Sequence, residues 1–151
     1  METETSKNPL IAEKHGLMIA IGLIVFFFLM RVFDLLYVVE LRVFNVVIMV
    51  VGIILAIKAF RKTGEEKFTY FRGMGVAVTT GIIGSIIFGV FVFFYVSFID
   101  TGLMQSIIEN EPMGRFMNPY IVSVIIAVEG VASALLVSFI LMNYLDPTKL
   151  E

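Results

Sequence analysis

Four long runs of apolar residues, separated by short polar stretches, dominate the chain. We expect them at about residues 16–38, 43–60, 73–99 and 119–145. Each is close to or above the roughly 20 helical residues that cross a bilayer of about 30 Å. Only helices or closed barrels satisfy their backbone hydrogen bonds in lipid, and these runs lack the alternation of barrel strands. The pattern predicts an all-α, polytopic membrane protein with four transmembrane helices in a single domain.

The connection between the third and fourth runs predicts a further short helix at about residues 101–110. Asp100 or Thr101 can cap it, and its apolar residues recur at helical spacing. A short amphipathic helix between two spans is expected to lie flat on the outer membrane surface. The alternative is that it covers the mouth of a cavity. The fourth long helix should begin with Asn118 as its N-cap and Pro119 at its first position.

Composition supports the membrane class and narrows the possible chemistry. The 151 residues are 59% hydrophobic and 16% charged, whereas soluble domains are roughly 25% charged. The net charge is -2 and no basic tract is dense, so nucleic-acid binding is not expected. There is no cysteine, and His15 is the single histidine. We therefore expect no metal and no cofactor, and the lipid bilayer is the first expected partner.

Basic residues are distributed unevenly between the two sides of the predicted bundle. The side with the second connection and both termini carries Lys7, Lys14, Lys58, Arg61, Lys62, Lys67, Arg72 and Lys149. The opposite side carries only Arg31, Arg42 and Arg115. The positive-inside rule then predicts that both termini are cytoplasmic. No small-residue cleavage site follows the first run, so we expect it to remain as a span.

Small residues form a regular stripe along the third run. Residues four apart share one helix face, and small side chains let two helices approach closely in lipid. The stripe consists of Gly73, Ala77, Gly81, Ser85 and Gly89, and a weaker one in the fourth run consists of Ser123, Ala127, Gly130, Ala134 and Ser138. We expect the two runs to pack against each other within one chain. The alternative is a homodimer contact through one of the stripes.

Glu129 is a lone carboxylate near the middle of the fourth apolar run. An ionised acid at that depth costs at least roughly 2.5 kcal/mol, so something must compensate it. Ser133 follows one turn later on the same side of the helix. Arg31, in the outer part of the first run, is the best cationic candidate to pair with Glu129. Asp34 competes for Arg31 because the two are three residues apart on one helix.

Two functions follow from Glu129. In the first, a paired or protonated Glu129 stabilises the bundle of a non-enzymatic accessory or scaffold subunit, which is the leading hypothesis. In the second, Glu129 exchanges a proton for a cation in a small proton- or cation-coupled transporter that acts as a homo-oligomer. In either function, the protein would act with another copy of itself or with another membrane protein. A cavity reaching Glu129 would favour transport, whereas a dry, paired Glu129 would favour the scaffold.

Other features add no chemistry. No nucleotide-binding loop or nucleophile motif is present, so no enzymatic activity is expected. Aromatic residues cluster in the outer halves of the first and third runs, where we interpret them as packing and anchoring groups. We find no polar residues that would define a ligand pocket among them.

Six short motifs lie between residues 54 and 144: Ala56-Ile57-Lys58, Phe60-Arg61-Lys62, Phe68-Thr69-Tyr70-Phe71-Arg72-Gly73, Phe98-Ile99-Asp100, Asn118-Pro119-Tyr120 and Glu129-Gly130-Val131-Ala132-Ser133. In these motifs and their order, residues 54–144 resemble a family of small membrane proteins, domain of unknown function 4199, found mostly in Bacteroidetes. The resemblance implies four spans and a location in the bacterial inner membrane. It implies no established activity, and the first run is too generic to contribute to it.

Overall fold

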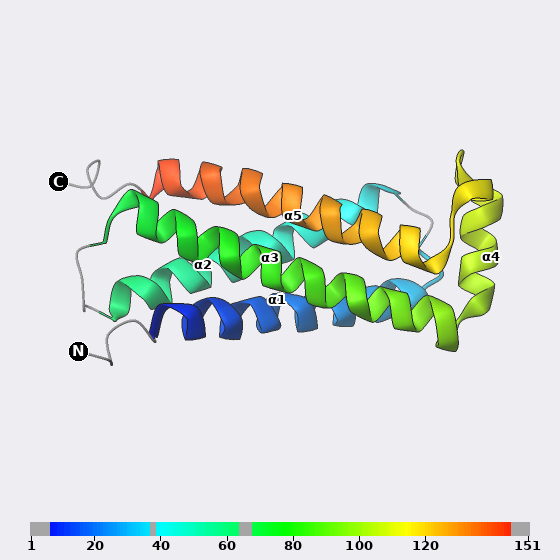
Figure 1. Cartoon of the computed structure of the whole chain (residues 1–151), viewed down its shortest axis with the longest axis horizontal. Helices are drawn as coiled ribbons and strands as arrows, with labels where there is room; N and C mark the ends of the chain where they lie inside the picture. Colours follow the sequence, from blue (N-terminus) through cyan, green and yellow to red (C-terminus); the bar gives the residue numbers. More distant parts are fainter. Residues whose placement is uncertain (1–6, 37–38, 64–67, 146–151) are drawn as a thin grey trace.

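Four long helices run alongside one another over most of the chain (Figure 1). The computed structural model describes residues 7–36, 39–63 and 68–145. The long helices are α1 (Lys7–Val32), α2 (Val43–Lys62), α3 (Tyr70–Phe94) and α5 (Pro119–Tyr144). Within the described ranges, these four are long and apolar enough to cross a membrane. The predicted fold class, an all-α protein with four membrane-spanning helices and one short extra helix, is confirmed.

The first helix differs most from its predicted bounds of 16–38. It begins earlier, at Lys7, and ends at Val32. Two residues later Asp34 has a φ of 56°, a left-handed conformation that ends a right-handed helix and that aspartate tolerates better than most residues. The predicted end, Val38, lies outside the described residues. A four-residue 3-10 turn, η1 (Val39–Arg42), then leads into α2.

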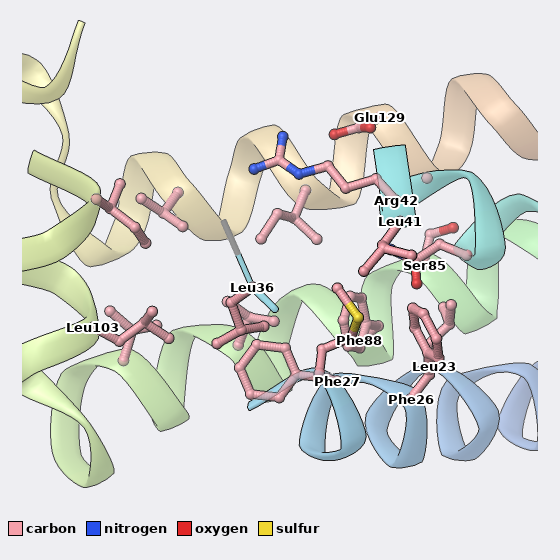
Figure 2. Close-up of a pocket in the computed structure, with 18 of the residues that line it drawn as sticks. Leu23, Phe26, Phe27, Leu36, Leu41, Arg42, Ser85, Phe88, Leu103 and Glu129 are labelled. Atoms are coloured by element: carbon pink, nitrogen blue, oxygen red, sulfur yellow. The ribbon is translucent and has the colours of Figure 1, made fainter. Parts of the chain in front are cut away.

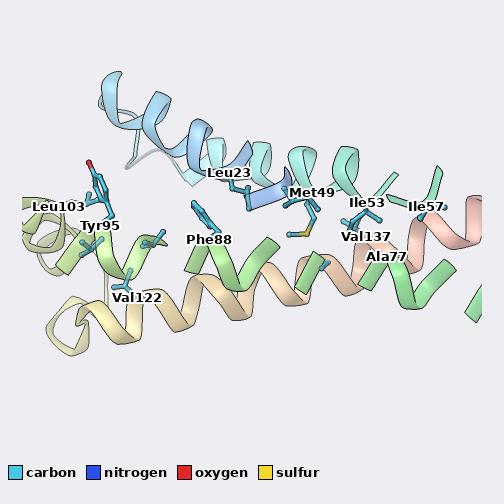
Figure 3. Packing of buried hydrophobic residues seen from close by; sticks show 14 of the residues in the cluster. Leu23, Met49, Ile53, Ile57, Ala77, Phe88, Tyr95, Leu103, Val122 and Val137 are labelled. Atoms are coloured by element: carbon cyan, nitrogen blue, oxygen red, sulfur yellow. The ribbon is translucent and has the colours of Figure 1, made fainter. Parts of the chain in front are cut away.

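α3 is the central helix of the bundle. It lies between α1 and α5 and packs along both, while α2 packs against α1 and α3 (Figure 1). Figure 3 shows buried side chains from different helices meeting in the core, among them Ile53 and Ile57 of α2 and Ala77 of α3. Ile53, Ile57 and Ala77 are completely buried. Because α3 separates α1 from α5, side chains on those two helices are kept apart.

The small-residue stripe of α3 faces α5. All five of its members are buried, namely Gly73, Ala77, Gly81, Ser85 and Gly89. A Cβ added to Gly81 would collide with the Cβ of Ala134, and one added to Gly89 would lie 3.0 Å from the Cβ of Ala127. Gly130 approaches the side chain of Ser85 in the same way. This face is therefore occupied within the chain, which leaves it unavailable for a homodimer contact.

A short helix, α4 (Thr101–Asn110), crosses one end of the bundle (Figure 1), hereafter the α4 end. α3 leads into it through a π-helical turn, η2 (Tyr95–Ile99). Asp100 caps α4 by accepting a hydrogen bond from the Leu103 backbone N–H at 2.9 Å. Leu103 and Met104 are buried in the main core. The apolar side of this helix therefore packs on the protein, and its flat position at the outer membrane surface stays a prediction.

The chain returns from α4 to the last long helix through a 3-10 turn, η3 (Gly114–Phe116). Gly114 packs so closely on the end of α4 that an added Cβ would collide with the backbone of Ile108. α5 then begins as predicted, with Pro119 in its first turn and the Asn118 side chain accepting a hydrogen bond from the Ile121 backbone N–H at 2.9 Å. This tight return brings the start of α5 beside the end of α3.

Candidate functional site

A cavity of about 530 Å³ extends from the α4 end to the middle of the bundle. Small-molecule sites commonly enclose roughly 300–1,000 Å³, so this volume suits a small organic ligand. α1, α2, α3 and α5 form its walls, and α4 contributes Leu103, Ser106, Ile107 and Asn110. α4 therefore covers the cavity, which is the alternative that the sequence left open for this helix.

The cavity ends at mid-bundle because the helices close together below it. Ser85, Met49 and Ser133 are among the deepest lining residues along their helices. One turn further along α3, a Cβ on Gly81 would meet both Ala134 of α5 and Ile53 of α2. This contact layer joins three helices and separates the cavity from the opposite end of the bundle.

The cavity has one apolar side and one polar side. Figure 2 shows Leu23, Phe26, Phe27 and Phe88 on the side formed by α1 and α3, opposite Glu129 on α5. The rings of Phe27 and Phe88 lie edge to face, with centroids 6.4 Å apart. Such an arrangement holds aromatic side chains in fixed positions and leaves a ligand an apolar wall.

Polar residues at the α4 end surround the mouth of the cavity. Arg42 ends η1 just before α2, Asn45 lies in the first turn of α2, Ser106 and Asn110 in α4, and Glu111 in the turn after α4. The Arg42 guanidinium lies 3.6 Å from a carboxylate oxygen of Glu111, so this ion pair connects α2 to the α4–η3 turn across the mouth. Both side chains are about half exposed, and such pairs contribute at most about 1 kcal/mol to stability.

Glu129 lines the cavity together with Ser133, one turn further along α5. Glu129 is also exposed at the surface of the chain. Among the described residues, it forms no ion pair within 4.0 Å and no side-chain hydrogen bond. The carboxylate thus reaches a cavity and is not buried against a partner from its own chain.

The expected pair between Arg31 and Glu129 does not form. Arg31 instead donates to Asp100 through Nε and Nη2, both at 2.8 Å, and its Nη1 lies 3.3 Å from Asp34. The reason is the helix order, because α3 lies between α1 and α5 and leads through η2 to Asp100, the N-cap of α4, which meets Arg31. The competing role of Asp34, three residues after Arg31, is confirmed. Of the four candidate polar residues, the structure brings Glu129 and Ser133 to the cavity and places Arg31 and Asp34 in a separate cluster.

Sequence reasoning missed the polar residues at the mouth of the cavity. Arg42 served only as a marker of orientation. One signal could have found part of the site, since Arg42 and Asn45 are three residues apart at the start of α2 and share one side of it. The statement that no polar residues define a pocket near the aromatic cluster is wrong for this reason.

Four spanning helices that enclose a polar-rimmed cavity define a multi-pass membrane protein. The sequence profile of the family described as protein of unknown function (DUF4199) matches residues 14–113, and the chain belongs to this family. The matched region begins and ends earlier than the resemblance over 54–144: it includes most of α1 and stops before α5 and Glu129. Comparisons with curated proteins and with solved structures gave no match.

Proposed function

We propose that this protein is a small proton- or cation-coupled transporter that acts as a homo-oligomer, with Glu129 as the coupling acid. The observation that carries the proposal is the cavity, which extends from the α4 end to a carboxylate at mid-bundle. A carboxylate in such a position binds either a proton or a cation, and the exchange couples the two. Intramembrane acids that face cavities commonly mark ion and proton pathways.

The scaffold hypothesis requires a different environment for Glu129. A purely structural acid at this depth is paired or hydrogen-bonded within the bundle, since an unsatisfied one is costly. The ion pairs of this end of the bundle use other residues, with Arg31 bound to Asp100 and Arg42 bound to Glu111. The geometry therefore favours the transporter over an accessory subunit. The proposed role is non-enzymatic, because it requires binding and release and no chemical conversion.

The proposed orientation places the α4 end outside a bacterial inner membrane, with both termini in the cytoplasm. Its support is the distribution of basic residues, and two of these, Lys67 and Lys149, lie outside the described residues. The α2–α3 side retains Lys58, Arg61, Lys62 and Arg72. In this orientation the cavity faces outward, so Glu129 would exchange with the external solution. A C-terminal reporter that is active only outside the cell would overturn this part of the proposal.

The homo-oligomer is proposed because one chain encloses Glu129 incompletely. Glu129 is exposed on α5, next to exposed apolar residues such as Val128 and Ile125. A second copy on this face would complete a pathway that four helices are too few to enclose. Crosslinking in membranes that yields only monomers would contradict it.

The test is a measurement of charge movement on a solid-supported membrane that carries reconstituted protein. A rapid drop in pH should drive protons into the cavity to Glu129 and give a transient current, because the charge moves through part of the membrane field. The Glu129→Gln variant should lose this current. Glu109→Gln is the matched control, because Glu109 lies exposed on α4, outside the cavity lining, and should leave the current unchanged. Equal currents from wild type and Glu129→Gln would refute the coupling role and favour the scaffold.

Access to the cavity can be tested separately, since the chain contains no cysteine. A Ser133→Cys variant places a single thiol in the cavity wall, whereas Ser138→Cys places it on the same helix in a completely buried position. A membrane-impermeant maleimide added to intact cells should label the first variant and not the second. Labelling of neither variant, or labelling only after the cells are opened, would contradict an outward-facing cavity.

A further inference from the structure

The wall of the cavity opposite Glu129 is apolar and aromatic. Leu23, Phe26 and Phe27 of α1 and Phe88 of α3 lie on that side (Figure 2). Leu23 and Phe88 are buried, so their positions are fixed by packing against the bundle. A ligand must present carbon groups to these four side chains, since none of them can replace the hydrogen bonds of a hydrated polar group.

The charges around the cavity leave one negative charge in excess when Glu129 is ionised. The lining contains Arg42, Glu111 and Glu129 as its charged residues. Arg42 lies in an ion pair with Glu111 at 3.6 Å, which offsets its positive charge at the mouth. Glu129 lies deeper and has no such pair among the described residues. The electrostatics of the lining thus favour a cation.

A divalent metal cation fits this lining poorly. Calcium takes six to eight oxygen ligands and magnesium about six, usually from several carboxylates and carbonyls. The part of the chain that the structure describes contains no cluster of three acidic, histidine or cysteine residues that could hold a metal ion. An organic cation needs no such ligand shell, because one carboxylate and the faces of aromatic rings can replace its weak hydration.

We propose that the cavity binds an organic cation with an apolar or aromatic body, which lies against Phe27 and Phe88 while its positive charge faces Glu129. This inference rests on the proposed function and names the substrate class of the same site. The cavity volume of about 530 Å³ suits an organic molecule of several rings and far exceeds the roughly 30 Å³ occupied by one water molecule. Binding of the cation and binding of a proton at Glu129 are then mutually exclusive, which provides the coupling.

The exposed part of the lining indicates how such a ligand enters. The exposed lining residues are Arg42 at the end of η1, Val46 of α2, Asn110 at the end of α4, Pro112 after it, and Glu129 of α5. The opening therefore lies between α2 and α5, beneath the cover that α4 provides. An amphiphilic cation that gathers at the membrane surface would meet this opening directly.

The experiment measures binding of tetraphenylphosphonium to the full chain in lipid nanodiscs by equilibrium dialysis, with empty nanodiscs as background. Two further probes separate shape from charge: tetraphenylborate has the same shape and a negative charge, and tetramethylammonium has the charge without the rings. Tetraphenylphosphonium should bind saturably, and both other probes should bind at least about tenfold more weakly. Stronger binding of tetraphenylborate would overturn the proposal.

Variants then assign the binding to the cavity. Glu129→Gln should weaken tetraphenylphosphonium binding about tenfold or more, and Phe88→Ala several-fold. The matched controls are Asp34→Asn and Phe98→Ala, since both residues are exposed and lie outside the cavity lining, and both should leave binding unchanged. Unchanged binding by Glu129→Gln would overturn the proposal.

A protection measurement keeps the test valid if a variant fails to fold. Tetraphenylphosphonium should slow maleimide labelling of Ser133→Cys in a chain that retains Glu129, and an unchanged labelling rate would overturn the proposal. Failure of the proposed substrate class can be distinguished from failure of the proposed transport function. Acid-jump currents that depend on Glu129, without tetraphenylphosphonium binding, would refute the substrate class and leave the coupling role intact. Loss of both signals would refute both.

Discussion

Asp100 connects three elements at the α4 end, so its removal should have a defined cost. One carboxylate oxygen accepts the Leu103 backbone N–H at 2.9 Å, and the other accepts Arg31 Nε and Nη2 at 2.8 Å. Loss of an N-cap typically costs about 1 kcal/mol. The ion pair is partly buried, with side-chain exposures of 16% for Asp100 and 36% for Arg31. Its loss should cost about 1–2 kcal/mol, between the values for exposed and buried pairs.

The Asp100→Ala variant should therefore lower the free energy of unfolding by about 2–3 kcal/mol. Asp100→Asn keeps an oxygen that can cap α4 but loses the charge, so it should cost only about 1–2 kcal/mol. The assay is unfolding of purified protein in mixed micelles by increasing SDS, followed by circular dichroism. Asp34→Asn is the matched control, because Asp34 binds the same arginine at 3.3 Å, its side chain is 82% exposed, and asparagine tolerates its left-handed φ of 56°.

The control should lose less than about 1 kcal/mol. A loss in Asp34→Asn equal to that in Asp100→Ala would refute the argument from burial and capping. Asp100→Ala should also raise the labelling rate of Ser133→Cys, since a loosened α4 covers the cavity less well. An unchanged labelling rate alongside a large loss of stability would show that the contacts of Asp100 with Arg31 and Leu103 support the fold without controlling access to the cavity.

Three further predictions concern packing and capping, each checked by the same unfolding assay. Gly81→Leu should destabilise the bundle by about 1–3 kcal/mol or more, since the leucine side chain would collide with Ala134. Gly75→Leu should be nearly neutral, because an added Cβ meets nothing within 4 Å there. Equal effects of the two variants would contradict the α3–α5 contact. Ser138→Ala should stabilise the protein by about 1 kcal/mol, because the buried Ser138 hydroxyl has no hydrogen-bond partner among the described residues. A loss of stability would contradict this prediction and indicate that the hydroxyl has a partner. Asn118→Ala should cost about 1 kcal/mol through loss of the α5 cap, and a change below about 0.3 kcal/mol would argue against that cap.

Features that depend on neighbouring residues in the sequence were predictable. The apolar runs gave α2 and α5 within two residues of the observed bounds, and the third run matches α3 and η2 together within three residues. Asn118 was found as a cap and Asp100 as one of two candidates, because capping requires only a suitable side chain next to the first helical turn. The small-residue stripe of α3 likewise indicated a closely packed face, since residues four apart share a side of any helix.

Features that depend on which helices are neighbours were not predictable from one sequence. The first helix ended early at a backbone turn around Asp34, inside a run whose apolar character continued past it. Arg31 found Asp100 and not Glu129, because α3 lies between α1 and α5. Arg42 and Glu111 are far apart in the sequence and meet only because α4 crosses the end of the bundle.

Glu129 shows most clearly which features the sequence determines and which depend on the tertiary structure. The sequence by itself determined that a carboxylate lies at mid-depth in a membrane-spanning helix, because hydropathy and helix length are local properties of the chain. Only the tertiary structure decided what surrounds it, because a cavity is enclosed by several helices whose order and rotation no single run encodes. In that arrangement Arg31 binds Asp100 and does not pair with Glu129. The aromatic wall of the cavity lies opposite Glu129 (Figure 2). The carboxylate predicted as one half of a structural pair therefore lies in a cavity that suits a ligand.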